Sequence, residues 1–245
     1  MFDYQAPAKL LKDRVILVTG ANRGIGAALA KGCAALGAQV ILQGRDAAAL
    51  DQVRAEIQAS GGQAAEPLVL DLENADEAAY AAAAERLQQE FGRLDGLVHN
   101  AGLLGPRVLL ERTPAEALAQ VMQVNVLAGF ALTQALLPLL KASGDASVVF
   151  TSSSVGRKGR AGWGAYSVSK FATEGLMQVW AEELAEAAIR VNSVNPGGTR
   201  TAMRAAAYPE EDPARVPVPE AILPVYLYLL GPESRGTTGQ ALNAQ

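Results

Sequence analysis

Short apolar runs alternate along the chain with longer stretches in which apolar residues recur at helical spacing. The runs are rich in Val, Ile and Leu, and they predict strands at 15–19, 39–43, 66–71, 96–100, 147–152, 190–195 and 240–243. The stretches between them predict helices near 24–36, 46–59, 74–91, 114–141, 165–187 and 219–230. Short connections favour right-handed crossovers on both faces of a parallel sheet. We therefore expect the α/β class, a Rossmann-type doubly wound parallel sheet of about seven strands with helices on both faces.

The pattern contains no repeat and no linker, so residues 1–245 are expected to form a single domain around one sheet. One stretch, 201–217, breaks the alternation with Pro209, Pro213 and Pro217. We interpret it as a substrate-loop region, which leaves open whether it is a mobile lid or a plain surface connection.

Composition narrows the range of partners. The chain has 21 Lys and Arg against 25 Asp and Glu, so it offers no broad positive surface and a nucleic-acid partner is not expected. No run approaches the roughly 18 apolar residues of a membrane span, and residues 1–14 carry charges where a signal peptide has its apolar centre. The single cysteine, Cys33, is expected to be a packed side chain. These features predict a cytoplasmic protein with no membrane partner.

A glycine-rich turn follows the first predicted strand and precedes the first predicted helix. Glycines there let the chain turn tightly and bring backbone N–H groups, at the positive end of the helix dipole, close to a pyrophosphate. This position in the first β-α-β unit predicts a dinucleotide site, and the alternative is a tight turn without a ligand. The candidate residues are Gly20, Asn22, Arg23, Gly24, Ile25 and Gly26.

The second predicted strand ends at Gly44 and Arg45, where an NAD-preferring domain usually has an acidic residue against the ribose hydroxyls. Arg23 supplies a second guanidinium, and two such planar donor groups suit a 2′-phosphate. We therefore expect NADP as the cofactor, with NADPH preferred over NADH. The alternative is that Arg45 pairs with Asp46 or lies in water.

Tyr166 and Lys170 stand four residues apart, so both lie on one face if 165–187 is a helix. A fixed ammonium stabilises a phenolate, and a tyrosine with its ordinary pKa of about 10 needs such a neighbour to exchange protons near neutral pH. Ser153 lies at the end of the fifth predicted strand, where its hydroxyl can donate to a substrate carbonyl oxygen. Taken alone, a Tyr-x-x-x-Lys pair is more often one face of an amphipathic helix.

Several motifs, in one order along the whole chain, resemble the short-chain dehydrogenase/reductase family. They are Thr19-Gly-x-x-x-Gly-x-Gly26, Asn100-Ala101-Gly102, Asn125, Ser153, Tyr166-x-x-x-Lys170 and Pro196-Gly197. Within the family, segments 151–157, 163–166 and 195–203 look most similar to the YciK-type oxidoreductases of bacteria, a subgroup name that supplies no substrate. The resemblance implies hydride transfer between NADP(H) and a carbonyl or alcohol substrate, with Tyr166 as the general acid/base.

The resemblance also implies roles for the other matching residues. Asn125 is expected to order a water beside Lys170 and to complete a catalytic set with Ser153 and Tyr166, although a helix-packing Asn is the alternative. Helices 114–141 and 165–187 are expected to associate in a homodimer or homotetramer. The remaining cofactor residues are expected to be Asp71 and Leu72 along the adenine, Asn100, Ala101 and Gly102 at its ribose, and Pro196, Gly197, Thr199 and Thr201 at the nicotinamide carboxamide, beside Tyr166 and Lys170.

Several features leave the substrate open. The basic turn at Arg157, Lys158 and Arg160 either attracts an acidic substrate or is a solvated turn. His99, the only histidine, is expected to be a packed, hydrogen-bonded side chain, and no constellation of His, Cys and carboxylates predicts a metal site. The candidate substrate-lining residues are Leu103, Leu104, Val155, Arg157 and Trp163, together with 201–217.

Two other classes of function compete with the enzyme. One is a dinucleotide-binding sensor or scaffold without turnover. Against it, all four expected catalytic positions hold residue types that can perform the reaction. The other is an epimerase or dehydratase on the same fold. The final residues 242–245 also depart from the Gly-Gly finish common in the family, which leaves their contacts open.

Overall fold

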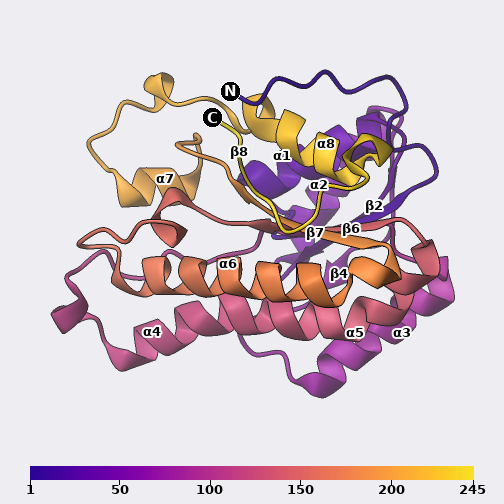
Figure 1. Ribbon diagram of the computed structural model, residues 1–245. Coiled ribbons are helices and arrows are strands. Elements are labelled where there is room, and N and C mark those ends of the chain that lie inside the picture. Colours follow the sequence, from indigo (N-terminus) through magenta and orange to yellow (C-terminus); the bar gives the residue numbers. More distant parts are fainter.

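The computed structural model describes residues 1–245, and it shows one eight-stranded parallel sheet between two layers of helices (Figure 1). The strand order is β3-β2-β1-β5-β6-β7-β8, and β4 pairs with β2 beside β3. The strands are β1 (Val15–Thr19), β2 (Gln39–Gly44), β3 (Gln63–Ala64), β4 (Leu68–Val69), β5 (Gly96–His99), β6 (Ala146–Thr151), β7 (Ile189–Asn195) and β8 (Ala241–Asn243).

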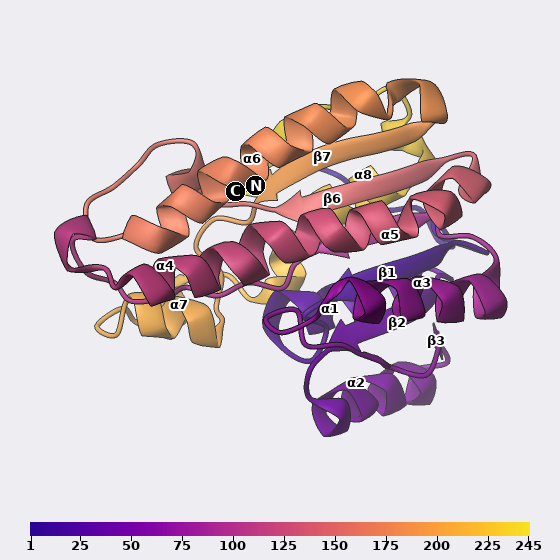
Figure 2. The same cartoon turned by 90° about the horizontal axis from the view of Figure 1, so that it is seen from below.

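Helices cover both faces of the sheet, as the doubly wound pattern predicts (Figure 2). One layer contains α1, α2 and α8, and the other contains α3, α4, α5 and α6 (Figures 1 and 2). The helices are α1 (Gly24–Ala35), α2 (Ala47–Ala59), α3 (Glu77–Phe91), α4 (Ala115–Met122), α5 (Ala128–Ser143), α6 (Gly164–Glu183), α7 (Ala202–Ala207) and α8 (Leu223–Leu230).

The central strands are apolar on both faces because helices cover both. Ile16, Leu17 and Val18 in β1 are fully buried although successive side chains point to opposite faces. Each face therefore has its own core, one containing Leu29 from α1 and the other Leu132 from α5. Full burial of each such side chain contributes ~1.5–3 kcal/mol, so the two cores hold the sheet rigid under the site described below.

The sequence pattern was wrong about the third strand. The run 66–71 does not form one strand; β3 and β4 each contribute only two residues beside β2, and Leu70 to Asp71 leave the sheet. The predicted helix at 74–91 begins at Glu77, because the Asp76 carboxylate accepts the Ala79 N–H at 2.9 Å and caps it.

Two helical regions also differ from the prediction. The stretch 114–141 is helical, but Gln123–Leu127 forms a single π-helical turn between α4 and α5. The stretch 201–217 contains a short helix, α7, which begins where the Thr201 hydroxyl accepts the Arg204 N–H at 3.1 Å. This part of the expected substrate loop is therefore ordered structure.

Ala115–Ser143 is long and apolar enough, by length and composition alone, to cross a membrane. In the fold it lies along the sheet, and its inner residues Leu132, Leu136 and Leu140 are fully buried in a core. Two of its outer apolar residues, Leu127 and Phe130, remain exposed.

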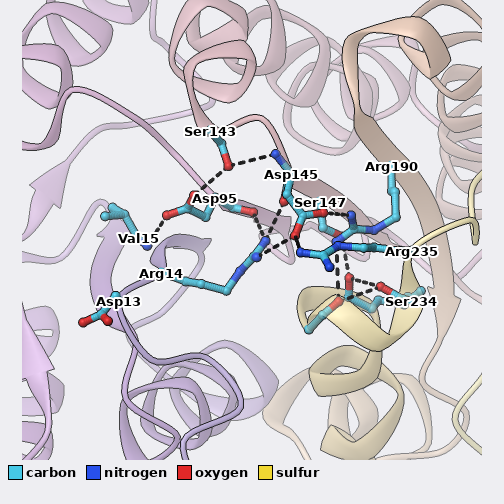
Figure 3. Close-up of polar contacts among 12 residues, drawn as sticks. Asp13, Arg14, Val15, Asp95, Ser143, Asp145, Ser147, Arg190, Ser234 and Arg235 are labelled. Carbon is cyan, nitrogen blue, oxygen red and sulfur yellow. Dashed lines mark hydrogen bonds and ion pairs between the residues drawn. The ribbon is translucent and has the colours of Figure 1, made fainter.

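A network of arginines and aspartates closes the edge of the sheet at which the strands begin (Figure 3). Asp145, just before β6, pairs with Arg14 at 3.2 Å, with Arg235 at 3.0 Å and with Arg190. Burial acts against its charge, but the arginines prevail and hold the pKa of Asp145 near 2. This network fastens β1, β6, β7 and the segment after α8 to one another, far along the strands from the site.

Candidate active site

A cavity of about 510 Å³ opens at the edge where the strands end. Doubly wound folds bind ligands at this edge because the loops between strands and helices meet there. The lining includes every predicted cofactor residue except Gly26, and it also includes Ser153, Tyr166 and Lys170. The segments that resemble a cofactor site and those that resemble a catalytic site therefore share one cavity.

The glycine loop lies between β1 and α1 and fits a pyrophosphate. Gly20 has a φ of +63°, which is strained for any residue with a side chain, and a Cβ built there would lie 3.0 Å from the Ala101 Cα. Only glycine fits this position. Gly26 does not line the cavity. A Cβ on Gly26 would clash with the Gly20 carbonyl oxygen, so this glycine permits close packing of α1 on the loop rather than ligand contact.

Both predicted phosphate-binding arginines lie at the cavity, and both are exposed. Arg45 does not pair with Asp46, which caps α2 through the Ala49 N–H at 3.1 Å. Instead, the Arg45 guanidinium lies 3.5 Å from the Glu73 carboxylate, which also lines the cavity. Because both partners remain accessible, this weak pair can open for a phosphate.

The phenol of Tyr166 and the ammonium of Lys170 project from the same face of α6. The Lys170 nitrogen lies 5.5 Å from the centre of the Tyr166 ring and donates to the Thr151 carbonyl at 2.7 Å. Burial lowers the pKa of Lys170 to about 8, and the Glu174 carboxylate opposes that shift. Burial raises the pKa of Tyr166 to about 12, and the Ser153 hydroxyl acts in the other direction. The phenol is therefore a proton donor whose acidity depends on the positive charge placed around it.

Ser153 lies just after β6 with its hydroxyl beside Tyr166. Its oxygen accepts the Val155 N–H at 3.5 Å, and its own proton can be donated on the cavity side, where the Tyr166 hydroxyl lies. The neighbouring Ser152 is buried, and Ser154 is exposed in the following turn. Of the three serines, Ser152 and Ser153 border the cavity, and only Ser153 acts on Tyr166.

Asn125 lies buried in the π-helical turn. Its amide oxygen accepts the Leu103 N–H at 2.7 Å, and its amide nitrogen donates to the Leu103 carbonyl and to Ser169, both at 2.9 Å. It therefore fixes the loop after β5 to α6. A small cavity of about 10 Å³, the room of one water molecule, is lined by Asn125 and Lys170.

His99 is a packed side chain, as the sequence predicts. Its ring stacks on Phe150 with centroids 4.6 Å apart, and Nε2 lies 2.8 Å from the Thr133 hydroxyl. Burial lowers its pKa to about 3, so the imidazole is neutral and takes no part in acid/base chemistry near neutral pH.

The segment after β7 forms another wall of the cavity and contains Pro196, Gly197, Thr199 and Thr201. Gln245 holds this segment from behind, since its amide donates to the Pro196 carbonyl at 2.6 Å and to the Gly198 carbonyl at 2.9 Å. No sequence motif points to Gln245, because residue 245 reaches the segment only through the pairing of β7 and β8.

The candidate substrate end of the cavity is lined by Leu103, Leu104 and Trp163, three of the residues proposed from the sequence, and by α7 residues that include Met203 and Ala207. The predictions for Val155 and Arg157 were wrong. Val155 is buried in the turn after β6, and Arg157 points away from the cavity toward Glu174 and β8. Arg107 stacks over the Trp163 ring at 4.1 Å and donates to the Ala207 carbonyl, so it joins the two walls of this end.

Other lining residues escaped the sequence pattern. Glu73 and Leu70 reach the cavity because the short strand β4 lies beside β2. Met203 and Arg204 lie in the stretch 201–217 that was expected to line the site, and they reach the cavity because α7 forms there.

A parallel doubly wound sheet with a glycine loop, and with Ser, Tyr and Lys side chains beside it, defines a dinucleotide-binding oxidoreductase fold. Residues 14–212 match the family described as short chain dehydrogenase, and the chain belongs to that family. Among its relatives is the uncharacterized oxidoreductase YciK of Escherichia coli K12, 51% identical over 242 residues that cover 99% of this chain and 96% of the relative. The predicted resemblance to YciK-type oxidoreductases is thus confirmed.

Solved structures agree over the whole chain. A short-chain dehydrogenase from Pseudomonas syringae is 62% identical and covers 100% of both chains with a TM-score of 0.98. One from Shigella flexneri 2a, solved in complex with NADP, is 51% identical and covers 98% of this chain and 100% of its own with a TM-score of 0.95. The single-sheet fold is therefore shared with relatives, one of which holds NADP.

Proposed function

We propose that this oxidoreductase transfers a hydride between NADP(H) and a carbonyl or alcohol substrate, with Tyr166 as the general acid/base. The observation that best supports this proposal is that Tyr166, Lys170 and Ser153 line the same cavity as the glycine loop. Gly20, Arg23 and Arg45 would hold the pyrophosphate and the 2′-phosphate, and the segment 196–201 would hold the nicotinamide. When bound, the cofactor supplies or accepts the hydride.

The side chains of the chain itself then handle the proton. Ser153 donates a hydrogen bond to the substrate carbonyl oxygen and stabilises the negative charge that develops there. Tyr166 gives its phenolic proton to the same oxygen, and the Lys170 ammonium stabilises the phenolate that remains. The room for one water between Lys170 and Asn125 gives a route by which Tyr166 regains its proton.

The substrate end favours an uncharged, apolar carbonyl compound. Leu103, Leu104 and Met203 line it, and the lining contains no carboxylate at this end. Arg204, the cation of α7, is neutralised by two hydrogen bonds to Glu211, from Nε at 2.6 Å and from Nη2 at 2.5 Å. The two other arginines nearby are engaged by the protein itself, since Arg107 stacks on Trp163 and donates to the Ala207 carbonyl and Arg200 donates to the Pro213 and Val216 carbonyls. A ketone should therefore have a lower KM than its carboxylated analogue of the same shape, and steady-state kinetics on the pair test this.

The function is tested by a screen of the purified protein with NADPH against ketones, aldehydes, quinones and ketoacyl thioesters. Oxidation of NADPH that depends on one of these classes supports the proposal. Tight NADPH binding without turnover on any class would favour the sensor or scaffold instead, and conversion without net NADPH oxidation would favour an epimerase or dehydratase.

We also propose a cytoplasmic location.

We further propose a homodimer or homotetramer formed through the helical stretch 114–141 and through α6. The outer faces of these segments expose large apolar side chains that a monomer would leave in water. They are Leu127, Phe130, Val168, Phe171 and Val179.

A further inference from the structure

The basic turn after β6 divides into two kinds of side chain. Lys158 and Arg160 are exposed, whereas Arg157 is half-buried and uses all three of its guanidinium nitrogens. Nε donates to Glu174 at 3.1 Å, Nη1 to the Asn243 side chain at 2.8 Å, and Nη2 to the Leu242 carbonyl at 3.0 Å. Arg157 therefore connects the turn after β6 to α6 and to β8.

Glu174 is the anionic centre of this contact. It lies one helical turn after Lys170, and both side chains are buried on the same part of α6. One carboxylate oxygen accepts from Arg157 and the other from the Ser193 hydroxyl of β7 at 2.7 Å. A carboxylate with both oxygens bonded is thus fixed one helical turn from the catalytic ammonium, and it raises the pKa of Lys170 against the effect of burial.

The other end of the contact reaches the cavity wall. Asn243 in β8 accepts from Arg157 and also from the Asn195 amide at 3.0 Å. The Asn195 side chain in turn accepts the Gly197 N–H at 3.1 Å. Gly197 lines the cavity in the segment that would hold the nicotinamide. A continuous series of hydrogen bonds thus runs from α6 to this segment.

We propose that Glu174, Arg157 and Asn243 are positioning residues that hold the catalytic helix α6 and the wall at Pro196–Gly198 in one fixed relation. Hydride transfer requires the reacting atoms to be aligned, and a displacement of about 1 Å lowers rates up to a hundredfold. The inference rests on the proposed function, in which Tyr166 and Lys170 act on a substrate placed against that wall. It gives Arg157 a role that contacts neither substrate nor cofactor.

The test compares Arg157→Ala, Arg157→Lys and Asn243→Ala with the matched control Lys158→Ala, an exposed cation of the same turn. Asn243 is itself exposed, so its variant should fold as the parent does. We expect Arg157→Ala and Asn243→Ala to lower kcat and to weaken NADPH binding, measured by fluorescence titration, roughly ten- to hundredfold. Arg157→Lys should recover only part of this, since one ammonium cannot replace three directed donors. Lys158→Ala should match the parent.

A second readout separates positioning from mere support of the fold. The Glu174 carboxylate raises the pKa of Lys170, so Glu174→Gln should lower that pKa further. The loss of activity at high pH should then begin at a lower pH than in the parent. The proposal is overturned if Arg157→Ala and Asn243→Ala change only thermal stability, with kcat, NADPH affinity and the pH profile as in Lys158→Ala. A parent protein that neither binds NADPH nor reduces any carbonyl compound would instead refute the proposed function itself.

Discussion

Lys170 and Tyr166 face the same cavity with the ammonium nitrogen 5.5 Å from the centre of the phenol ring. The ammonium is held in place by the Thr151 carbonyl at the end of β6, so the sheet fixes the distance between the two groups. In the surroundings of the protein alone, the phenol has a pKa of about 12. Proton transfer near neutral pH therefore depends on keeping the neighbouring ammonium charged.

The first prediction concerns pH. Because the pKa of Lys170 is lowered to about 8, its positive charge is lost as the pH rises through that value, and carbonyl reduction should fall with it. Replacing Lys170 by Met should remove this fall and leave a rate lower by a factor of ~10²–10⁴ at pH 7. Profiles of kcat/KM against pH for the two proteins check this. A parent rate that stays level well above pH 8 would contradict it.

The second prediction concerns the choice of cofactor. Arg45→Ala should weaken NADPH binding by roughly ten- to hundredfold, the effect of losing one charge-assisted hydrogen bond, and should leave NADH binding unchanged. Glu73→Gln, which removes the carboxylate 3.5 Å from Arg45, should strengthen NADPH binding. Fluorescence titrations with both nucleotides measure these effects. Equal affinities of the parent for NADPH and NADH would show that the arginines do not bind a 2′-phosphate.

A third prediction concerns stability at low pH. Asp145 has a folded pKa of about 2 against an ordinary 3.8, so its ion pairs stabilise the fold above about pH 4 and lose effect as the pH falls toward 2. Asp145→Asn should cost about 2–4 kcal/mol at pH 7, because it leaves buried Arg190 without its carboxylate. Between pH 4 and 2, its stability should depend less on pH than that of the parent.

Urea unfolding over this pH range measures the effect. Asp51→Asn is the matched control, because that carboxylate is exposed and lies 3.8 Å from Arg54. Equal unfolding free energies of the two variants would contradict the stabilising role of the ion pairs in Figure 3.

A fourth prediction concerns assembly. Phe171 is 46% exposed on α6, and a glutamate there would place a charge in the proposed interface. Phe171→Glu should therefore sediment as a smaller species than the parent in analytical ultracentrifugation. Ala48→Glu is the control, because Ala48 is exposed in the first turn of α2, and it should leave the sedimenting mass of the assembly unchanged. A parent that already sediments as a monomer would rule out the interface.

The strongest periodic segments allowed correct prediction of most of the fold. Val15–Thr19 matches its predicted range, because a fully buried parallel strand is an unbroken apolar run. The third strand did not follow its run, since pairing of two residues each in β3 and β4 depends on neighbours in space. Helix α7 was not predicted, because the three prolines that follow it dominate the pattern of 201–217.

The residues that line the cavity could be predicted where they belong to a motif beside a strand or on one helix, and could not where distant segments meet. Tyr166 and Lys170 lie on one helix, as their spacing predicts, and they were singled out because the other family motifs stand in order around them. The pair between Arg45 and Glu73 was not, because it depends on β4 lying beside β2. Arg157 was misassigned for the same reason: its partners Glu174 and Asn243 lie 17 and 86 residues away.

The most direct test of the account is the turnover and NADPH affinity of Tyr166→Phe, which removes one hydroxyl and keeps the ring. The change should leave the fluorescence-titrated affinity for NADPH within about twofold of the parent and lower turnover on any accepted carbonyl compound by a factor of ~10²–10⁴ or more. Turnover equal to that of the parent would contradict the assignment of Tyr166 as the proton donor, and with it the proposed mechanism.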